Sequence, residues 1–169
     1  MIKPRQKTPN LKVSLVNNTK WILSEQNPKH FTLIVFYRGK HCPVCKKQLE
    51  DLQKKIHKFE ERGVHVIAIS ANTKELAEET HKEWDIENVP VGYNFSIDDA
   101  RKWGLFITKA IKEKEPDVFF EPGIFLIDTE QKVYWQSIQS MPFGRPKFRE
   151  ILNGIDYILN ENYPARGEA

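Results

Sequence analysis

The stretch from Phe31 to Cys45 reads FTLIVFYRGKHCPVC, and it decides the fold of the chain. Residues 31–37 are a nearly unbroken run of β-branched and aromatic side chains, which is typical of a strand buried on both faces of a sheet. From Pro43 the spacing becomes helical, because apolar residues recur every three or four positions at Cys45, Leu49, Leu52, Ile56 and Phe59. The pattern predicts a buried strand, a cysteine motif and an amphipathic helix that Gly63 ends.

Strand and helix patterns alternate along the rest of the chain. Strands are predicted over 11–16, 20–23, 64–70, 91–95, 123–128 and 132–136, the last two as a hairpin. Helices are predicted over 73–84, 97–103 and 148–159. Residues 108–118 carry charges of alternating sign and are expected to form a surface insertion. The alternation of strands and helices indicates an α/β fold.

Composition indicates one globular domain. The 169 residues suit a single domain, which we expect over 11–169 after a flexible Pro- and Lys-rich segment at 1–10. The net charge of +3 is small and scattered, so no nucleic-acid or membrane-surface partner is expected. No stretch approaches the ~18 apolar residues of a membrane span, and no apolar segment follows the basic N-terminus. A cytoplasmic location is therefore expected.

Two cysteines, Cys42 and Cys45, are the only ones in the chain. A loop this short stabilises a fold little, so their value should lie in chemistry. Pro43 suits the first helical position, which leaves Cys42 at the helix N-terminus, where a thiol pKa falls from about 8.5 into the range ~3.5–7.5. Further positive charge comes from Arg38, Lys40 and His41. Since Cys45 lies on the apolar stripe, we expect Cys42 to be exposed and to attack, and Cys45 to resolve.

Two other interpretations of the cysteine pair are weaker. A closed zinc site needs four ligands, and the five histidines include no H-x₃₋₅-H pair that could complete one. Inert core cysteines are common, but a C-x-x-C between a buried strand and a helix favours redox chemistry. No metal or organic cofactor is implied.

Residues 36–45 resemble the active-site segment of the thioredoxin superfamily. They are most similar to its peroxiredoxin-like branch, the alkyl hydroperoxide reductase/thiol-specific antioxidant (AhpC/TSA) family, and the resemblance extends from about Leu11 to Leu159. Segments 141–146 and 163–168 look like those of a bacterial subgroup. The resemblance implies a thioredoxin-like fold, a central mixed β-sheet flanked by helices, here with an N-terminal strand extension. It also implies an antioxidant role and a possible homodimer.

A few single positions distinguish the two reactions that the resemblance implies, peroxide reduction as in peroxiredoxins and thiol–disulfide exchange as in thioredoxins. Peroxiredoxins place the peroxide-attacking cysteine where Cys45 stands, and a threonine or serine where Cys42 stands. They also place a proline at the position of Arg38 and an arginine just before the late strand, where this chain has residues 121–123, Glu-Pro-Gly. Pro122 matches the cis-proline of thioredoxins, so we expect a cis bond that presents the preceding backbone to a substrate. The alternative is that Pro122 merely starts a strand, a position that proline tolerates.

The remaining candidates are charged. Thioredoxins carry a buried acid where this chain has Phe36, and Glu121 is the candidate substitute. Arg38 is a candidate charge partner of the thiolate. Arg145, between Gly144 and Pro146, could bind an anion or face solvent, and the solvent-facing position is favoured. The candidate substrate-binding residues are Arg38, His41, Pro43, Glu121 and Pro122.

The sequence favours a thiol–disulfide oxidoreductase. In that hypothesis the Cys42 thiolate attacks a protein or small-molecule disulfide, Cys45 displaces the product, and a thioredoxin-type reductant restores the dithiol. The nearest alternative is a thiol peroxidase that reduces hydroperoxides through a sulfenic acid. In that alternative the family position favours attack by Cys45, whereas exposure favours attack by Cys42. A third hypothesis is a thioredoxin-like binding module whose cysteines are dispensable.

Overall fold

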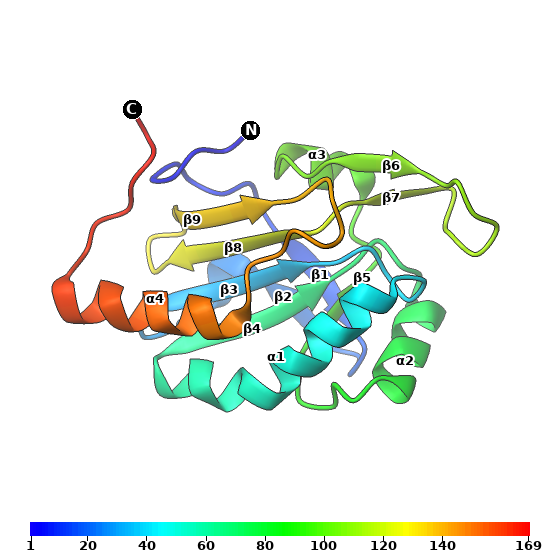
Figure 1. The fold of residues 1–169 in the computed structure, drawn as a ribbon, viewed down its shortest axis with the longest axis horizontal. Coiled ribbons are helices and arrows are strands. Elements are labelled where there is room, and N and C mark those ends of the chain that lie inside the picture. The colour runs from blue at the N-terminus through cyan, green and yellow to red at the C-terminus, as the bar shows by residue number, and fades with distance from the viewer.

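A seven-stranded mixed sheet forms the centre of the protein in a computed structural model that describes residues 1–169 (Figure 1). Its strand order is β2-β1-β5-β4-β3-β8-β9. Its strands are β1 (Lys12–Leu15), β2 (Lys20–Ile22), β3 (Phe31–Phe36), β4 (Val64–Ile69), β5 (Val91–Tyr93), β8 (Gly123–Asp128) and β9 (Val133–Ile138). β3, β4 and β5 are parallel, and the neighbouring strands pair antiparallel. The predicted thioredoxin-like α/β fold with two additional N-terminal strands is confirmed.

β3 is buried on both faces, as predicted. It pairs in parallel with β4 on one side and antiparallel with β8 on the other. Because side chains alternate along a strand, Leu33 and Val35 enter one hydrophobic core while Ile34 and Phe36 enter the other. The run of apolar residues is therefore explained by two cores that share one strand.

Helices cover both faces of the sheet (Figure 1). They are α1 (Pro43–Glu61), α2 (Lys74–Glu83), α3 (Ile97–Lys102) and α4 (Phe148–Glu161). α1 and α4 pack against each other and bury their apolar stripes in one core, and α3 packs into the other. Pro43 begins α1 and Gly63, at φ +69°, follows its end, so both predicted helix boundaries are confirmed.

The loop between β3 and α1 carries the residues that precede the cysteines, and contacts with Asn72 and with α2 hold its backbone in place. Gly39 has φ +129°, and a Cβ there would lie 2.6 Å from Nδ2 of Asn72, so only glycine fits. The Lys40 N–H donates to Asn72 Oδ1 at 2.8 Å, and the Lys40 ammonium pairs with Glu79 and Glu83 on α2. The loop therefore enters α1 in a defined conformation.

The expected insertion at 108–118 is wrong in part, because its two ends are paired strands. β6 (Ile107–Lys109) and β7 (Val118–Phe120) form a separate antiparallel hairpin. Phe119 and Phe120 are both buried, and the Phe120 ring meets the Phe36 ring edge-on at 5.8 Å between centroids. The two aromatic side chains anchor this hairpin, and residues 111–114 at its tip are exposed.

The N-terminal residues, which were expected to be flexible, lie along β9. The Arg5 N–H donates to the Val133 carbonyl at 2.7 Å, and the Thr8 N–H donates to the Gln131 carbonyl at 3.0 Å. Ile2 is buried in the core that also holds Phe36. None of the helices combines the length and apolar character needed to cross a bilayer.

The aromatic cluster around Phe36 gives a stability test. The Phe36 ring lies 5.4–5.8 Å from those of Phe95, Trp103, Phe120 and Phe125. Phe36→Ala should lower the free energy of unfolding by about 3–5 kcal/mol because it opens a cavity between these rings. Urea denaturation would measure the loss. Phe143→Ala is the control, since that side chain is 77% exposed and its removal should change stability by less than about 0.5 kcal/mol. Equal effects of the two changes would contradict this description of the core.

Candidate active site

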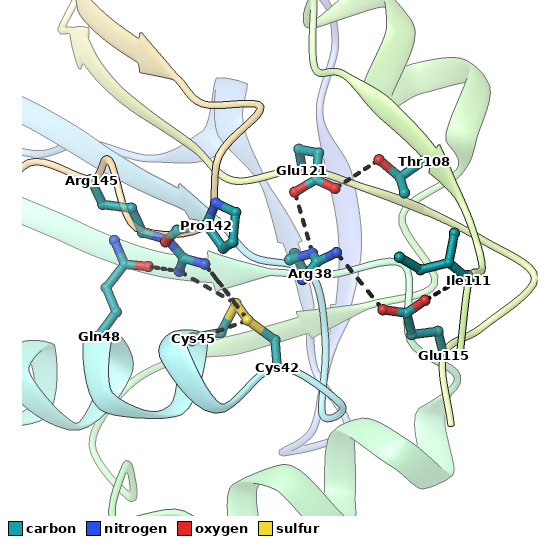
Figure 2. A network of polar contacts seen from close by, with 10 residues as sticks. All are labelled: Arg38, Cys42, Cys45, Gln48, Thr108, Ile111, Glu115, Glu121, Pro142 and Arg145. Atoms are coloured by element: carbon teal, nitrogen blue, oxygen red, sulfur yellow. Dashed lines mark hydrogen bonds and ion pairs between the residues drawn. A yellow bond between two sulfur atoms is a disulfide. The ribbon is translucent and has the colours of Figure 1, made fainter. Parts of the chain in front are cut away.

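Cys42 and Cys45 form a disulfide on the first turn of α1, as Figure 2 shows. Cys42 is the N-cap residue, and its Sγ accepts the Cys45 backbone N–H at 3.2 Å. The Lys46 N–H donates to the Cys42 carbonyl at 3.1 Å, so the first helical turn is closed while the disulfide is present. The two sulfurs can therefore bond without unwinding the helix.

Both cysteines are buried, which corrects the expectation that Cys42 is exposed. Cys42 is 2% exposed and Cys45 is 0% exposed. The helical stripe correctly placed Cys45 in the core. It could not show that another segment lies over the end of the helix. That segment is the loop between β9 and α4, and it brings Arg145 over the disulfide (Figure 2).

Arg145 contacts both sulfurs, so the expectation that it faces solvent is wrong. Its Nη1 and Nη2 each lie 3.3 Å from Cys45 Sγ, and Nη2 lies 3.6 Å from Cys42 Sγ. The guanidinium is held by Gln48 Oε1, at 2.6 Å from Nη1, and by the Pro142 carbonyl, at 2.7 Å from Nε. Burial lowers the pKa of Arg145 to about 10, so it remains a cation near neutral pH.

The same arrangement adds Gln48 to the site. Gln48 lies one turn after Cys45 on α1, so its spacing could have placed it on the same helical face. Arg145 could not have been found that way, because its contacts with Cys45 span 100 residues.

Arg38 does not contact the sulfurs. Its Nε lies 3.2 Å from Glu121 Oε2, its Nη2 lies 3.9 Å from Glu115 Oε1, and its guanidinium stacks over the Phe119 ring at 4.7 Å (Figure 2). Glu121 is 5% exposed and also accepts a hydrogen bond from Thr108 Oγ1 at 2.7 Å. Glu121 thus points inward, but its charge is already balanced by Arg38. The sequence did not single out Glu115.

The other predicted residues lie around this network. The His41 ring packs against Phe119 with 4.7 Å between centroids, and burial, with the nearby Arg38 charge, lowers the His41 pKa, which favours the neutral imidazole. Pro43 occupies the first position of α1. Pro122 was expected to follow a cis bond, and this is wrong, since every peptide bond is trans. Pro122 instead starts a strand: it immediately precedes β8, and its carbonyl accepts a hydrogen bond from Gln139 N–H at 2.9 Å.

Comparison with known proteins identifies the family. The profile of the AhpC/TSA family matches residues 4–136. The chain is 29% identical over 143 residues to alkyl hydroperoxide reductase C of Helicobacter pylori (strain ATCC 700392 / 26695), covering 82% of this chain and 68% of that relative.

Solved structures agree on the fold. Peroxidoxin BcpB of Mycobacterium tuberculosis superposes with a TM-score of 0.76 at 16% identity, covering 94% of this chain and 99% of that one. The reduced 2-Cys peroxiredoxin of Plasmodium vivax superposes with a TM-score of 0.77 at 20% identity, covering 95% and 84%. The match to the family profile extends over most of the sheet and the whole of α1. The protein therefore belongs to the AhpC/TSA family and is a peroxiredoxin-like thiol oxidoreductase.

Proposed function

We propose that the Cys42–Cys45 pair reduces hydroperoxides. The observation that supports this substrate class is the burial of both sulfurs, at 2% and 0% exposure, beneath the Arg145 guanidinium. A peroxide is small enough to reach a sulfur at the edge of that guanidinium. A disulfide of a folded protein would have to displace the Arg145 loop first. The curated relative is an alkyl hydroperoxide reductase, which is consistent with the same substrate class.

Cys45 is the proposed nucleophile. Both terminal nitrogens of Arg145 contact its Sγ at 3.3 Å, whereas Cys42 Sγ receives one guanidinium contact at 3.6 Å and a backbone N–H at 3.2 Å. Hydrogen bonds from a cation to a thiolate are charge-assisted and favour the ionised form. The family position of the peroxide-attacking cysteine points to the same residue. Cys42 is then the resolving cysteine.

The proposed cycle has two chemical steps, reduction of the peroxide by Cys45 and formation of the disulfide with Cys42. The Cys45 thiolate attacks one peroxide oxygen, the O–O bond breaks, and the leaving alkoxide takes a proton to give an alcohol or water. Cys45 is now a sulfenic acid. The Cys42 thiol attacks the Cys45 sulfur, the hydroxyl leaves as water, and the disulfide forms. The dithiol has supplied two electrons, and the peroxide has accepted them.

Regeneration is proposed to occur by thiol–disulfide exchange with a thioredoxin-type dithiol. The Arg145 loop has to move aside for this step, as it would for any protein disulfide. The thiolate of the reductant would attack Cys42 Sγ, so that Cys45 leaves as a thiolate, and the second thiol of the reductant would then displace Cys42. We place this cycle in the cytoplasm, where reducing systems keep thiols available. Every residue of the cycle comes from one chain, so the homodimer expected from the family is not required for it.

Single-cysteine variants test the division of labour. In Cys42→Ser, peroxide should convert Cys45 to a sulfenic acid that accumulates, because no resolving thiol remains. In Cys45→Ser, oxidation should be at least about 100-fold slower, since the remaining Cys42 thiol receives only one guanidinium contact, at 3.6 Å. Trapping with a dimedone probe followed by mass spectrometry would measure both. Accumulation of a sulfenic acid on Cys42 at the wild-type rate would reverse the assignment. Oxidation of the wild-type protein no faster than a free thiol would rule out the peroxidase.

Arg145→Met tests the stabilisation of the thiolate. The rate constant for oxidation by hydrogen peroxide should fall about 10- to 100-fold, because charge-assisted hydrogen bonds to the reacting sulfur are lost. Stopped-flow tryptophan fluorescence would measure it. Arg149→Met is the matched control, since Arg149 is exposed on α4 and should be replaceable without effect. A rate unchanged in Arg145→Met would show that the guanidinium does not act on the reacting sulfur.

A further inference from the structure

We propose that the buried network of Arg38, Glu121 and Glu115 sets how readily the Cys42–Cys45 thiols ionise, and through this the redox equilibrium of the pair. The inference rests on the proposed dithiol function and deepens it. It assigns a role to three charged side chains that do not contact the sulfurs. Arg38, moreover, stands where peroxiredoxins have a proline.

The network joins the cysteine loop to a single other element, the β6–β7 hairpin. Arg38 follows β3 and lies four residues before Cys42. All of its partners belong to the hairpin or its end: Glu121 at 3.2 Å, Glu115 at 3.9 Å, and the face of the Phe119 ring at 4.7 Å. The side chains of Glu121 and Glu115 are 6% and 7% exposed, so water screens these charges little.

Both carboxylates are fixed in place by further hydrogen bonds. Thr108 Oγ1 donates to Glu121 Oε1 at 2.7 Å. The backbone N–H groups of Ile111 and Lys112 donate to Glu115 Oε2 at 2.8 and 3.1 Å (Figure 2). These N–H groups lower the Glu115 pKa, with a smaller contribution from the Arg38 charge, so this carboxylate is ionised at neutral pH.

The network reaches the cysteine loop through Arg38, four residues before Cys42. Figure 2 shows Arg38 between the cysteine pair and the two carboxylates. The charges of the network act on Arg145. Burial is the main cause of the lowered Arg145 pKa, the positive charge of Arg38 is the second cause, and the negative charge of Glu121 raises this pKa. A field that reaches the guanidinium at 3.3 Å from Cys45 Sγ also reaches that sulfur.

Few other charges face the site. His41 packs on the same Phe119 ring, and its lowered pKa favours the neutral form. Lys40 is turned toward α2, where Glu79 and Glu83 balance it. Gln48 on α1 is neutral. The charged groups of the network are therefore one guanidinium and two carboxylates.

The direction in which the thiol pKa changes in each variant follows from the charges of the network. Without the Arg38 cation, two carboxylates remain uncompensated and disfavour a thiolate, so the thiol pKa should rise and the disulfide should become harder to reduce. Without the Glu121 charge, Arg38 is balanced by Glu115 alone, so the thiol pKa should fall and the disulfide should become easier to reduce. A purely structural link would instead give defects in the same direction for both changes.

The test compares Arg38→Met, Glu121→Gln and the double variant in the full chain. Thiolate absorbance of the reduced protein, with the oxidised protein as blank, gives the thiol pKa. Equilibration with a glutathione redox buffer gives the equilibrium constant of the couple. Arg38→Met should stabilise the disulfide several-fold and Glu121→Gln should destabilise it several-fold, where a tenfold change is about 30 mV for this two-electron couple. The double variant should lie between the two single variants.

Two further variants make the test decisive. Glu115→Gln should shift the equilibrium in the same direction as Glu121→Gln, which keeps the inference testable if Arg38→Met fails to fold. Arg101→Met with Asp98→Asn removes an exposed ion pair on α3 and should shift nothing. Shifts of one sign in Arg38→Met and Glu121→Gln, or none in either glutamate variant, would overturn the inference. A wild-type protein that forms no disulfide equilibrium with glutathione would instead overturn the proposed function.

Discussion

The contact between the Arg145 guanidinium and the two sulfurs is the interaction on which the site depends. Both sulfurs are buried, and burial alone raises a thiol pKa and makes a cysteine inert. In the proposed function, the guanidinium 3.3 Å from Cys45 Sγ offsets that effect. Arg145 reaches the first turn of α1 because β9 ends at the same edge of the sheet as β3: Ile138 pairs with Gly123, which pairs with Phe36. The loop that follows β9 therefore begins beside the start of α1 and brings the guanidinium to the sulfurs.

This contact also resolves an apparent conflict within the family resemblance. Residues 121–123 stand where an arginine is expected in peroxiredoxins, and on sequence alone this departure argues against a peroxidase. The structure brings a guanidinium to the sulfurs from a different loop, about twenty residues later in the chain. What the thiolate needs is a cation at hydrogen-bonding distance, whichever element carries it. Glu121 then serves a different purpose, as the buried partner of Arg38.

The parts of the fold and site that follow from local pattern were predictable. β3, α1 and the cysteine pair at their junction were predicted because periodicity, proline at the first helical position and a terminal glycine act within a few residues. The site residues that were missed depend on contacts distant in sequence. Arg145 contacts Cys45 across 100 residues, and Glu115 meets Arg38 from a hairpin whose sequence shows only alternating charge. The predicted exposure of Cys42 failed for the same reason, since a helical stripe does not show what covers the helix end.

The most direct test of the account is the pH dependence of the second-order rate constant for oxidation of the reduced wild-type protein by hydrogen peroxide. In the proposed function the reacting cysteine is a thiolate stabilised by Arg145 and the N-terminus of α1. The rate constant should therefore reach its plateau with an inflection below about pH 7.5, and the plateau should lie far above the rate constant of a free thiol. A rate that rises through about pH 8.5, as for an unperturbed cysteine, would contradict it.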